Sequence, residues 1–158
     1  MNIRVIGIGN PLRGDDGIGL AVVEALQRGR LPAGVEIIEG GEVGVGLIGL
    51  MEGADSVVLV DAAEMGLEPG AFRVFGLNEI TVAGETLGCS AHEVRVGVAL
   101  RMAEALECLP QDVKVVGVQP KQMDWGIGLS YEVSEALEKV VEAVWEILDT
   151  SNRLKIED

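Results

Sequence analysis

Continuous apolar segments alternate along the chain with segments in which apolar residues recur every three or four positions. The continuous segments are rich in valine, isoleucine and leucine, as in strands that are buried on both faces of a sheet. They predict five strands, at Ile3–Ile8, Val35–Ile38, Val57–Asp61, Phe72–Phe75 and Val113–Val118. The periodic segments predict four helices, at Asp16–Arg28, Val43–Met51, Ala91–Glu107 and Tyr131–Leu148, the last with Ser130 as its N-cap.

This alternation predicts an α/β domain with three layers, a twisted and mostly parallel five-stranded sheet with helices on both faces. The strand at Phe72–Phe75 follows a turn-forming segment and is expected to be an antiparallel edge strand. The length of 158 residues suits one domain over residues 1–149, followed by a polar, frayed tail over residues 150–158.

The composition narrows the range of partners. The chain has 12 Lys and Arg residues against 26 Asp and Glu, a net charge of −14, which argues against nucleic acid and anionic membranes as partners. No apolar run reaches the roughly 18 residues of a transmembrane helix, and the first residues read as a strand and not as a signal peptide. A cytoplasmic location is therefore expected. The two cysteines, Cys89 and Cys108, do not form a disulfide framework.

The densest group of unusual residues lies between the first strand and the first helix, at Gly7–Gly19. Its sequence, GIGNPLRGDDGIG, holds five glycines, a proline and two adjacent aspartates. Glycine permits close backbone approach, so a ligand site is expected at this turn. The Gly7-x-Gly9 pair resembles the start of a dinucleotide fingerprint. That fingerprint needs a third glycine where this chain has Leu12, preceded by Pro11, so dinucleotide binding is disfavoured.

Polar residues also follow the other predicted strands. Glu39–Gly41 follows the second strand, Asp61 closes the third, Gln119 follows the last, and the single histidine, His92, begins the third helix. Because the carboxyl ends of parallel strands meet at one edge of a sheet, these side chains are expected to line one rim together with Asp16. Two carboxylates and a neutral imidazole suit a divalent transition metal with open coordination positions.

Plainer roles are open for the same residues. Asp15 or Asp16 could cap the first helix, Asp61 could cap a turn, and His92 could be a surface or capping residue. A thiol–imidazole pair of Cys89 and His92 is a weaker alternative, because a spacing of three residues does not orient one side chain toward the other.

The Gly7–Gly19 motif resembles the amino-terminal signature of the hydrogenase maturation endopeptidases. Those enzymes trim the C-terminal extension from the large-subunit precursor of [NiFe] hydrogenases. The resemblance continues in the expected order over nearly the whole chain, through Glu39-Gly40-Gly41, Val60-Asp61-Ala62, Ser90-Ala91-His92-Glu93, Gly117-Val118-Gln119-Pro120 and Gly126-Ile127-Gly128-Leu129-Ser130.

The resemblance implies that Asp16, Asp61 and His92 form a metal-binding and catalytic trio on a twisted sheet between helices. It also implies a supporting set made up of Glu39, Gly40, Gly41 and Gln119. The chain departs from the family pattern at Glu39, where aspartate is common, and at Glu42, where threonine is frequent. A shared ion requires donor atoms of the trio within about 5 Å of one another.

The implied reaction is hydrolysis of one peptide bond in a hydrogenase large-subunit precursor after nickel insertion. The nickel is then supplied by the precursor, and the motif glycines are expected to leave room for that metal to approach Asp16. Whether the metal activates water, polarises the scissile carbonyl or only docks the substrate stays open, as does a general-base role for Asp16 or Asp61. Two alternatives are a metal- or nucleotide-binding module without peptidase activity and a peptidase that acts on a different precursor.

Overall fold

The computed structural model describes residues 1–79 and 91–154, without the side chains of residues 91–95. All five predicted strands and all four predicted helices are present there, with some ends shifted. In chain order the elements are β1 (Ile3–Ile8), the 3-10 turn η1 (Gly14–Gly17), α1 (Ile18–Gln27), β2 (Val35–Gly41), α2 (Gly46–Met51), β3 (Ser56–Ala62), β4 (Phe72–Gly76), α4 (Ala91–Ala105), β5 (Asp112–Val118) and α5 (Tyr131–Arg153).

The five strands form one sheet in the order β2-β1-β3-β5-β4. The neighbours β2, β1, β3 and β5 run parallel, and β4 pairs antiparallel with β5 at one edge. The predictions of a mostly parallel sheet and of an antiparallel edge strand are therefore confirmed. The parallel order brings the carboxyl ends of β1, β2, β3 and β5 to the same edge, which we call the carboxyl edge.

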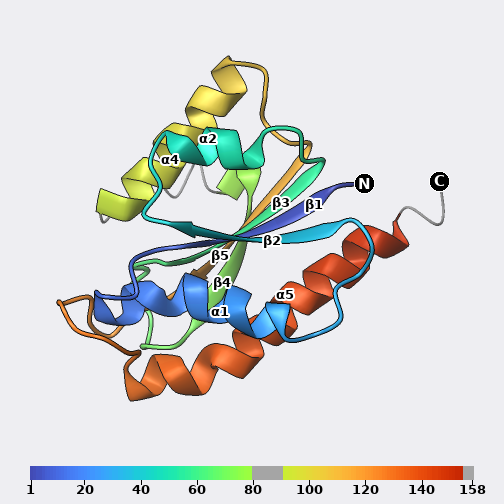
Figure 1. The fold of residues 1–158 in the computed structure, drawn as a ribbon. Helices are drawn as coiled ribbons and strands as arrows, with labels where there is room; N and C mark the ends of the chain where they lie inside the picture. Colours follow the sequence, from blue (N-terminus) through green and yellow to red (C-terminus); the bar gives the residue numbers. More distant parts are fainter. Residues whose placement is uncertain (80–90, 155–158) are drawn as a thin grey trace.

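Helices cover both faces of the twisted sheet, as Figure 1 shows, with α1 and α5 on one side and α2 and α4 on the other. Alternate residues of β3 supply both interfaces. Val58 and Val60 pack toward α1 and α5, whereas Val57 and Leu59 pack toward α2 and α4. Every residue of β3 is buried, and a fully buried aliphatic side chain contributes about 1.5–3 kcal/mol. The three-layer α/β architecture is confirmed.

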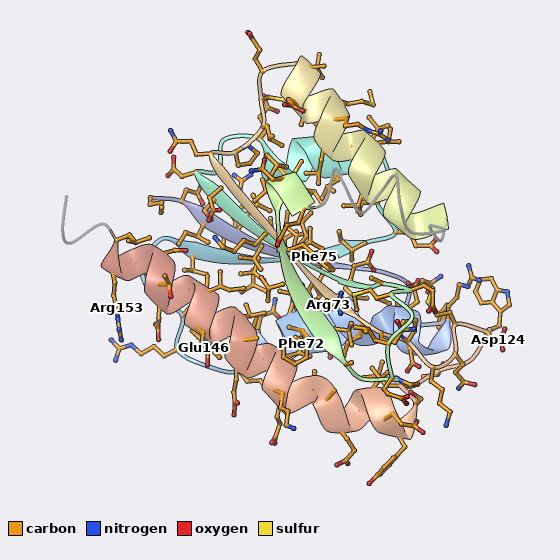
Figure 2. The ribbon with its side chains drawn as sticks, turned by 180° about the vertical axis from the view of Figure 1, so that it is seen from behind. Phe72, Arg73, Phe75, Asp124, Glu146 and Arg153 are labelled. Carbon is orange, nitrogen blue, oxygen red and sulfur yellow. The ribbon has the colours of Figure 1, made fainter. Side chains whose placement is uncertain are left out.

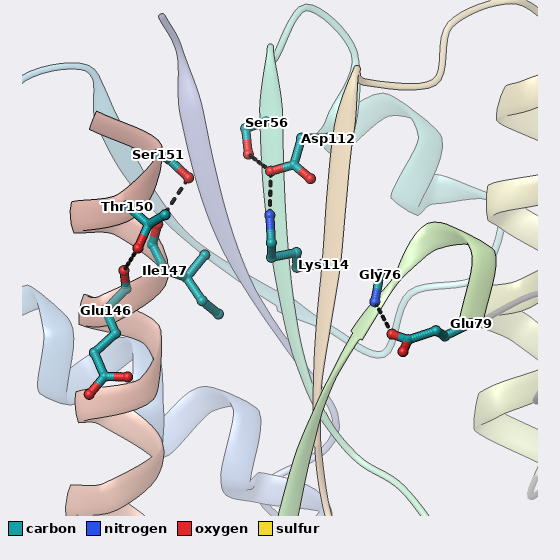
Figure 3. Close-up of polar contacts among 9 residues, drawn as sticks. All are labelled: Ser56, Gly76, Glu79, Asp112, Lys114, Glu146, Ile147, Thr150 and Ser151. Carbon is teal, nitrogen blue, oxygen red and sulfur yellow. Dashed lines mark hydrogen bonds and ion pairs between the residues drawn. The ribbon is translucent and has the colours of Figure 1, made fainter. Parts of the chain in front are cut away.

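The last helix is longer than its predicted span to Leu148. Ser151 is only 8% exposed and continues the buried face formed by Val140, Val144 and Leu148. Its hydroxyl donates to the carbonyl of Ile147 at 2.9 Å, one turn earlier (Figure 3). The expectation of a frayed tail from residue 150 is therefore wrong for residues 150–153, because the helix and its buried face continue through Ser151. Residues 155–158 lie outside the described part.

The edge opposite the carboxyl edge is fastened by polar contacts of its own. Asp112, the first residue of β5, accepts hydrogen bonds from the Ser56 hydroxyl at 3.2 Å and from the Lys114 ammonium at 2.7 Å (Figure 3).

Within the described residues, no helix has the length and apolar character needed to cross a membrane.

Candidate active site

The turn between β1 and α1 is built on close backbone contacts at glycine. A Cβ at Gly19 would overlap the carbonyl oxygens of Ile8 and Val60, so α1 lies directly against β1 and β3. A Cβ at Gly9, whose φ is +126°, would overlap the carbonyl oxygen of Asp16. Only glycine allows both approaches. The same packing carries η1 over the carboxyl edge, where it lies against β3.

The other motif glycines are enclosed in the same way. A Cβ at Gly14 would lie 2.9 Å from the carbonyl oxygen of Gln122, and one at Gly17 would lie 3.0 Å from the Cα of Pro11. These glycines therefore serve the close packing of the chain's own backbone, and the approach of a metal held in another protein to Asp16 stays a prediction. Open space is found instead at Gly41, where an added Cβ would have no neighbour within 4 Å.

Asp16 is completely buried in η1. One of its carboxylate oxygens, Oδ2, accepts a hydrogen bond from the backbone N–H of Asn10 at 2.9 Å. The side chain of Asn10 in turn accepts the N–H of Leu12 at 2.9 Å. The orientation of the Asp16 carboxylate is thus set by the turn that carries it, before any ligand binds.

Asp61 is 4% exposed and precedes the last residue of β3. Alternation along the strand puts it on the face of Val57 and Leu59, which α2 and α4 cover. In Figure 1, α4 begins near the carboxyl edge, and His92 belongs to its first turn. The structure therefore brings together, at one edge of the sheet, the three segments that carry Asp16, Asp61 and His92.

The side chain of His92 lies outside the described residues, as does Cys89. Among the described side chains, no group of three His, Cys, Asp or Glu is positioned to hold a metal ion. The shared ion of Asp16, Asp61 and His92 accordingly stays a prediction. The two buried carboxylates can in principle bind a divalent cation or accept a proton, the two capacities that a metal-assisted hydrolase needs.

Asp15, the neighbour of Asp16, fastens a distant loop to the site. Its buried carboxylate accepts four hydrogen bonds. The donors are the backbone N–H groups of Lys121 at 2.8 Å, Gln122 at 3.1 Å and Ser130 at 2.7 Å, and the Ser130 hydroxyl at 2.8 Å. All four belong to the segment of residues 119–130, which we call the β5–α5 loop.

Ser130 occupies the N-cap position of α5, as predicted, but its side chain makes no capping bond. Its hydroxyl donates to Asp15 instead. The predicted N-cap position of Ser130 is therefore confirmed, while its hydroxyl binds the buried carboxylate and not the end of the helix. A backbone contact adds to this attachment, since the N–H of Gly14 donates to the carbonyl of Gly126 at 2.9 Å.

Gln119 has a supporting role in the loop that follows Asp61. Its side-chain oxygen accepts the N–H groups of Met65 at 2.7 Å and Leu67 at 3.2 Å, and its amide nitrogen donates to Glu64 at 2.9 Å. The side chain thus shapes the β3–β4 connection and keeps two loop amides satisfied.

Glu39 is exposed near the end of β2, and its Cα pairs with that of Gly7 across the sheet. It is separated from β3 by the whole width of β1. The register shifts at the next position, so that Gly41 pairs with Ile8 and Gly40 has no partner in β1. A Cβ at Gly40 would lie 2.9 Å from the carbonyl oxygen of Gly7, so Gly40 serves the packing of this edge strand, whereas Gly41 faces open space at a φ of +67°.

One ion pair lies beside the β5–α5 loop. The Lys121 ammonium donates to the Glu132 carboxylate at 2.6 Å, and this hydrogen bond lowers the pKa of Glu132 below its ordinary value. This ion pair and the exposed apolar residues of the loop were not among the residues predicted from the sequence. The signal for the latter was the segment Trp125–Leu129, in which apolar residues alternate with two glycines, residues that weaken a strand and favour a loop.

Comparison with known proteins identifies the family. A model of the family described as hydrogenase maturation protease matches residues 20–147. The chain is 34% identical to the hydrogenase 2 maturation protease of Escherichia coli, over 91% of this chain and 88% of that protein. It is 32% identical to the hydrogenase expression/formation protein HoxM of Azotobacter vinelandii, over 93% of this chain and 72% of that protein.

Solved structures agree with these matches. The hydrogenase maturating endopeptidase HybD from Escherichia coli superposes with a TM-score of 0.87 at 32% identity, covering 96% of this chain and 94% of that one. The [NiFe] hydrogenase maturation protease HybD from Thermococcus kodakarensis gives a TM-score of 0.78 at 27% identity, over 94% of this chain and 99% of that one. The chain belongs to the hydrogenase maturation protease family. It is accordingly an endopeptidase of hydrogenase maturation, as the resemblance of its motifs predicted.

Proposed function

We propose that this endopeptidase removes the C-terminal extension of a [NiFe]-hydrogenase large-subunit precursor after nickel insertion. The nickel held by the precursor is part of the substrate, and Asp16, Asp61 and His92 recognise it. The observation that carries this proposal is the convergence of η1, the end of β3 and the first turn of α4 at the carboxyl edge. The [NiFe] hydrogenase maturation protease that the chain resembles in fold also supports it.

In this proposal Asp16 and Asp61 are metal ligands that rigid parts of the fold hold in place. The Asp16 carboxylate is oriented by the N–H of Asn10 at 2.9 Å, and Asp61 is fixed by a strand buried along its whole length. Ligands held on rigid elements need little reordering when a metal arrives in its substrate. Recognition of the metal would tell the enzyme that the hydrogenase centre is complete before the extension is lost.

Hydrolysis then follows the ordinary balance of peptide cleavage. The oxygen of a water molecule adds to the scissile carbonyl carbon, and the carbon–nitrogen bond breaks. Both protons of the water end on the departing amine, which leaves as an ammonium after a carboxylate has passed on the first, and the new C-terminal carboxylate remains on the large subunit. We assign this proton transfer to Asp16 or Asp61.

Cleavage of a purified, nickel-loaded precursor, followed as a shift on a denaturing gel, tests the proposal. We expect Asp16→Asn and His92→Ala to slow processing at least about 100-fold, the usual contribution of one acid–base or ligand group. Glu24→Gln is the matched control, because Glu24 is exposed on α1 and lies outside the site. Precursor without nickel should not be cut.

Normal processing by both Asp16→Asn and His92→Ala would refute the assignment of the trio. Equal processing of precursor with and without nickel would refute recognition of the metal while leaving the peptidase in place. Cleavage of a different precursor in preference to the hydrogenase subunit would transfer the proposal to that substrate. The expected cytoplasmic location is tested separately, by fractionation of cells that express the protein.

A further inference from the structure

Three apolar side chains stand out from the surface beside the site. Leu12 is 51% exposed, Trp125 is 75% exposed and Ile127 is 89% exposed. Leu12 belongs to the turn that carries Asp16, and the other two belong to the β5–α5 loop. We call these three residues the apolar prong. A single exposed apolar residue is ordinary, whereas a rigid group of them next to a site marks an interaction surface.

The prong is held rigidly from below. Arg13 and Gly126 form a parallel β-bridge, and the N–H of Gly126 donates to the carbonyl of Leu12 at 2.8 Å. The guanidinium carbon of Arg13 lies 5.4 Å from the centre of the Trp125 ring, within the range of a cation–π contact. The buried carboxylate of Asp15 fixes both ends of the same loop.

This bracing does not bury the prong residues themselves. In Figure 2 the loop around Asp124 extends away from the sheet, next to the turn that follows β1. The loop is therefore already ordered in the free protein, so the loop loses little further conformational entropy when a partner covers the prong. Large exposed aromatic and aliphatic side chains on such a base are typical of the residues that dominate binding energy in interfaces.

We propose that the apolar prong is a docking contact for the folded body of the hydrogenase large-subunit precursor, an inference that rests on the proposed function. The prong is continuous with the site, since Leu12 and Asp16 share one turn. A partner seated on the prong thereby brings its own metal centre toward Asp16. Projecting side chains need a concave receptor, which a folded surface offers and a flexible extension does not.

Charge defines the receptor further. Among the described residues Arg13 forms no ion pair, although the chain as a whole has a net charge of −14. The cation beneath Trp125 is thus available to a carboxylate of the partner. The receptor that fits is an apolar hollow with an acidic residue at its rim, on the folded precursor near its nickel.

Steady-state cleavage of the nickel-loaded precursor by the double variant Trp125→Ala/Ile127→Ala tests this inference. We expect KM to rise about 30-fold or more, as for the loss of an interface hot spot, with kcat within about twofold of the wild type. The melting temperature should change by no more than about 3 °C, because the removed side chains are exposed. The single variant Trp125→Phe, which keeps a large ring and Ile127, should have a KM much closer to that of the wild type than to that of the double variant.

Leu106→Ala/Leu154→Ala is the matched control. Both residues are 64% exposed, and they follow the ends of α4 and α5, at the edge of the sheet opposite the site. This control should leave KM unchanged. An unchanged KM in the prong variant, or an equal rise in the control, overturns the inference.

Three outcomes separate the possible causes of failure. If sedimentation shows a wild-type dimer that the prong variant converts to monomer, without a change in KM, the occupant is a second copy of the chain and the inference is overturned. If the wild type does not cut the precursor, the proposed function fails and the inference fails with it. If the wild type cuts it and the prong variant has the same KM, only the inference fails.

Discussion

Replacement of Asp15 by asparagine is expected to destabilise the protein by about 3–5 kcal/mol. The carboxylate accepts the Ser130 N–H on one oxygen and three further donors, including the Lys121 N–H, on the other. An asparagine keeps one acceptor oxygen, which it will aim at the three donors. Its amide nitrogen then faces the Ser130 N–H, so one charged hydrogen bond, worth about 1.5–3 kcal/mol, is lost and the other three are weakened.

Urea unfolding measures this loss, and amide hydrogen exchange locates it. Exchange at residues 121 and 130 should accelerate more than exchange in the strands, because the β5–α5 loop is released first. Asp124→Asn is the matched control, since Asp124 is exposed in the same loop (Figure 2) and should change stability by less than about 0.5 kcal/mol. A loss below about 1 kcal/mol in Asp15→Asn, or one equal to that in the control, would show that the four hydrogen bonds do not hold the loop.

Three further predictions concern packing, the β3–β4 loop and pH. Gly19→Ala should lower the free energy of unfolding by about 3 kcal/mol or more, measured by thermal unfolding, because the new Cβ would overlap main-chain oxygens that cannot move aside. Gly49→Ala, whose Cβ would have no neighbour within 4 Å, should be neutral or stabilising, and equal effects of the two substitutions would contradict the packing argument. Gln119→Leu should cost about 2–3 kcal/mol in urea unfolding, because two loop amides lose their acceptor, and a neutral result would mean that water replaces it. Lys121→Met should raise the pKa of Glu132 toward its ordinary value in a carboxyl titration by NMR, and identical titrations in the two proteins would rule out the ion pair as the cause. Because the pKa of Glu132 is lowered in the folded wild type, the ion pair stabilises the fold at pH values above the unfolded-state pKa. This stabilisation is lost as the pH falls through the folded-state pKa.

The central fold could be predicted because its strands are buried on both faces. The bounds of β1 agree with the sequence prediction at both ends, since its apolar run is continuous. The end of β2 was missed, because Glu39, Gly40 and Gly41 have no strand propensity and are held in the sheet by β1. The end of α5 was missed for a similar reason, since burial against the sheet outweighs the polar character of Ser151.

The candidate site was predictable to the extent that topology alone determines it. The rule that strand ends meet at one edge predicted that the segments carrying Asp16, Asp61 and Gln119 lie together there, as they do, while their side chains forming one site stays a prediction. The partners of Asp15 were missed because they lie 106 to 115 residues away in sequence and include backbone N–H groups, which every residue carries. No local pattern can indicate such a partnership, in which the hydroxyl of the N-cap residue Ser130 binds Asp15 and makes no capping bond.

The large sequence separation between Asp15 and its hydrogen-bond donors also sets an order of events during synthesis. Their donors include Ser130, so a nascent chain that has not yet emerged to the start of α5 lacks what holds the β1–α1 turn in place. The sheet order imposes the same delay, because β5 must join β3 before β4 can pair with it. Contacts between such distant segments form late in folding. A growing chain can therefore complete the braced β1–α1 turn only after residue 130 has left the ribosome.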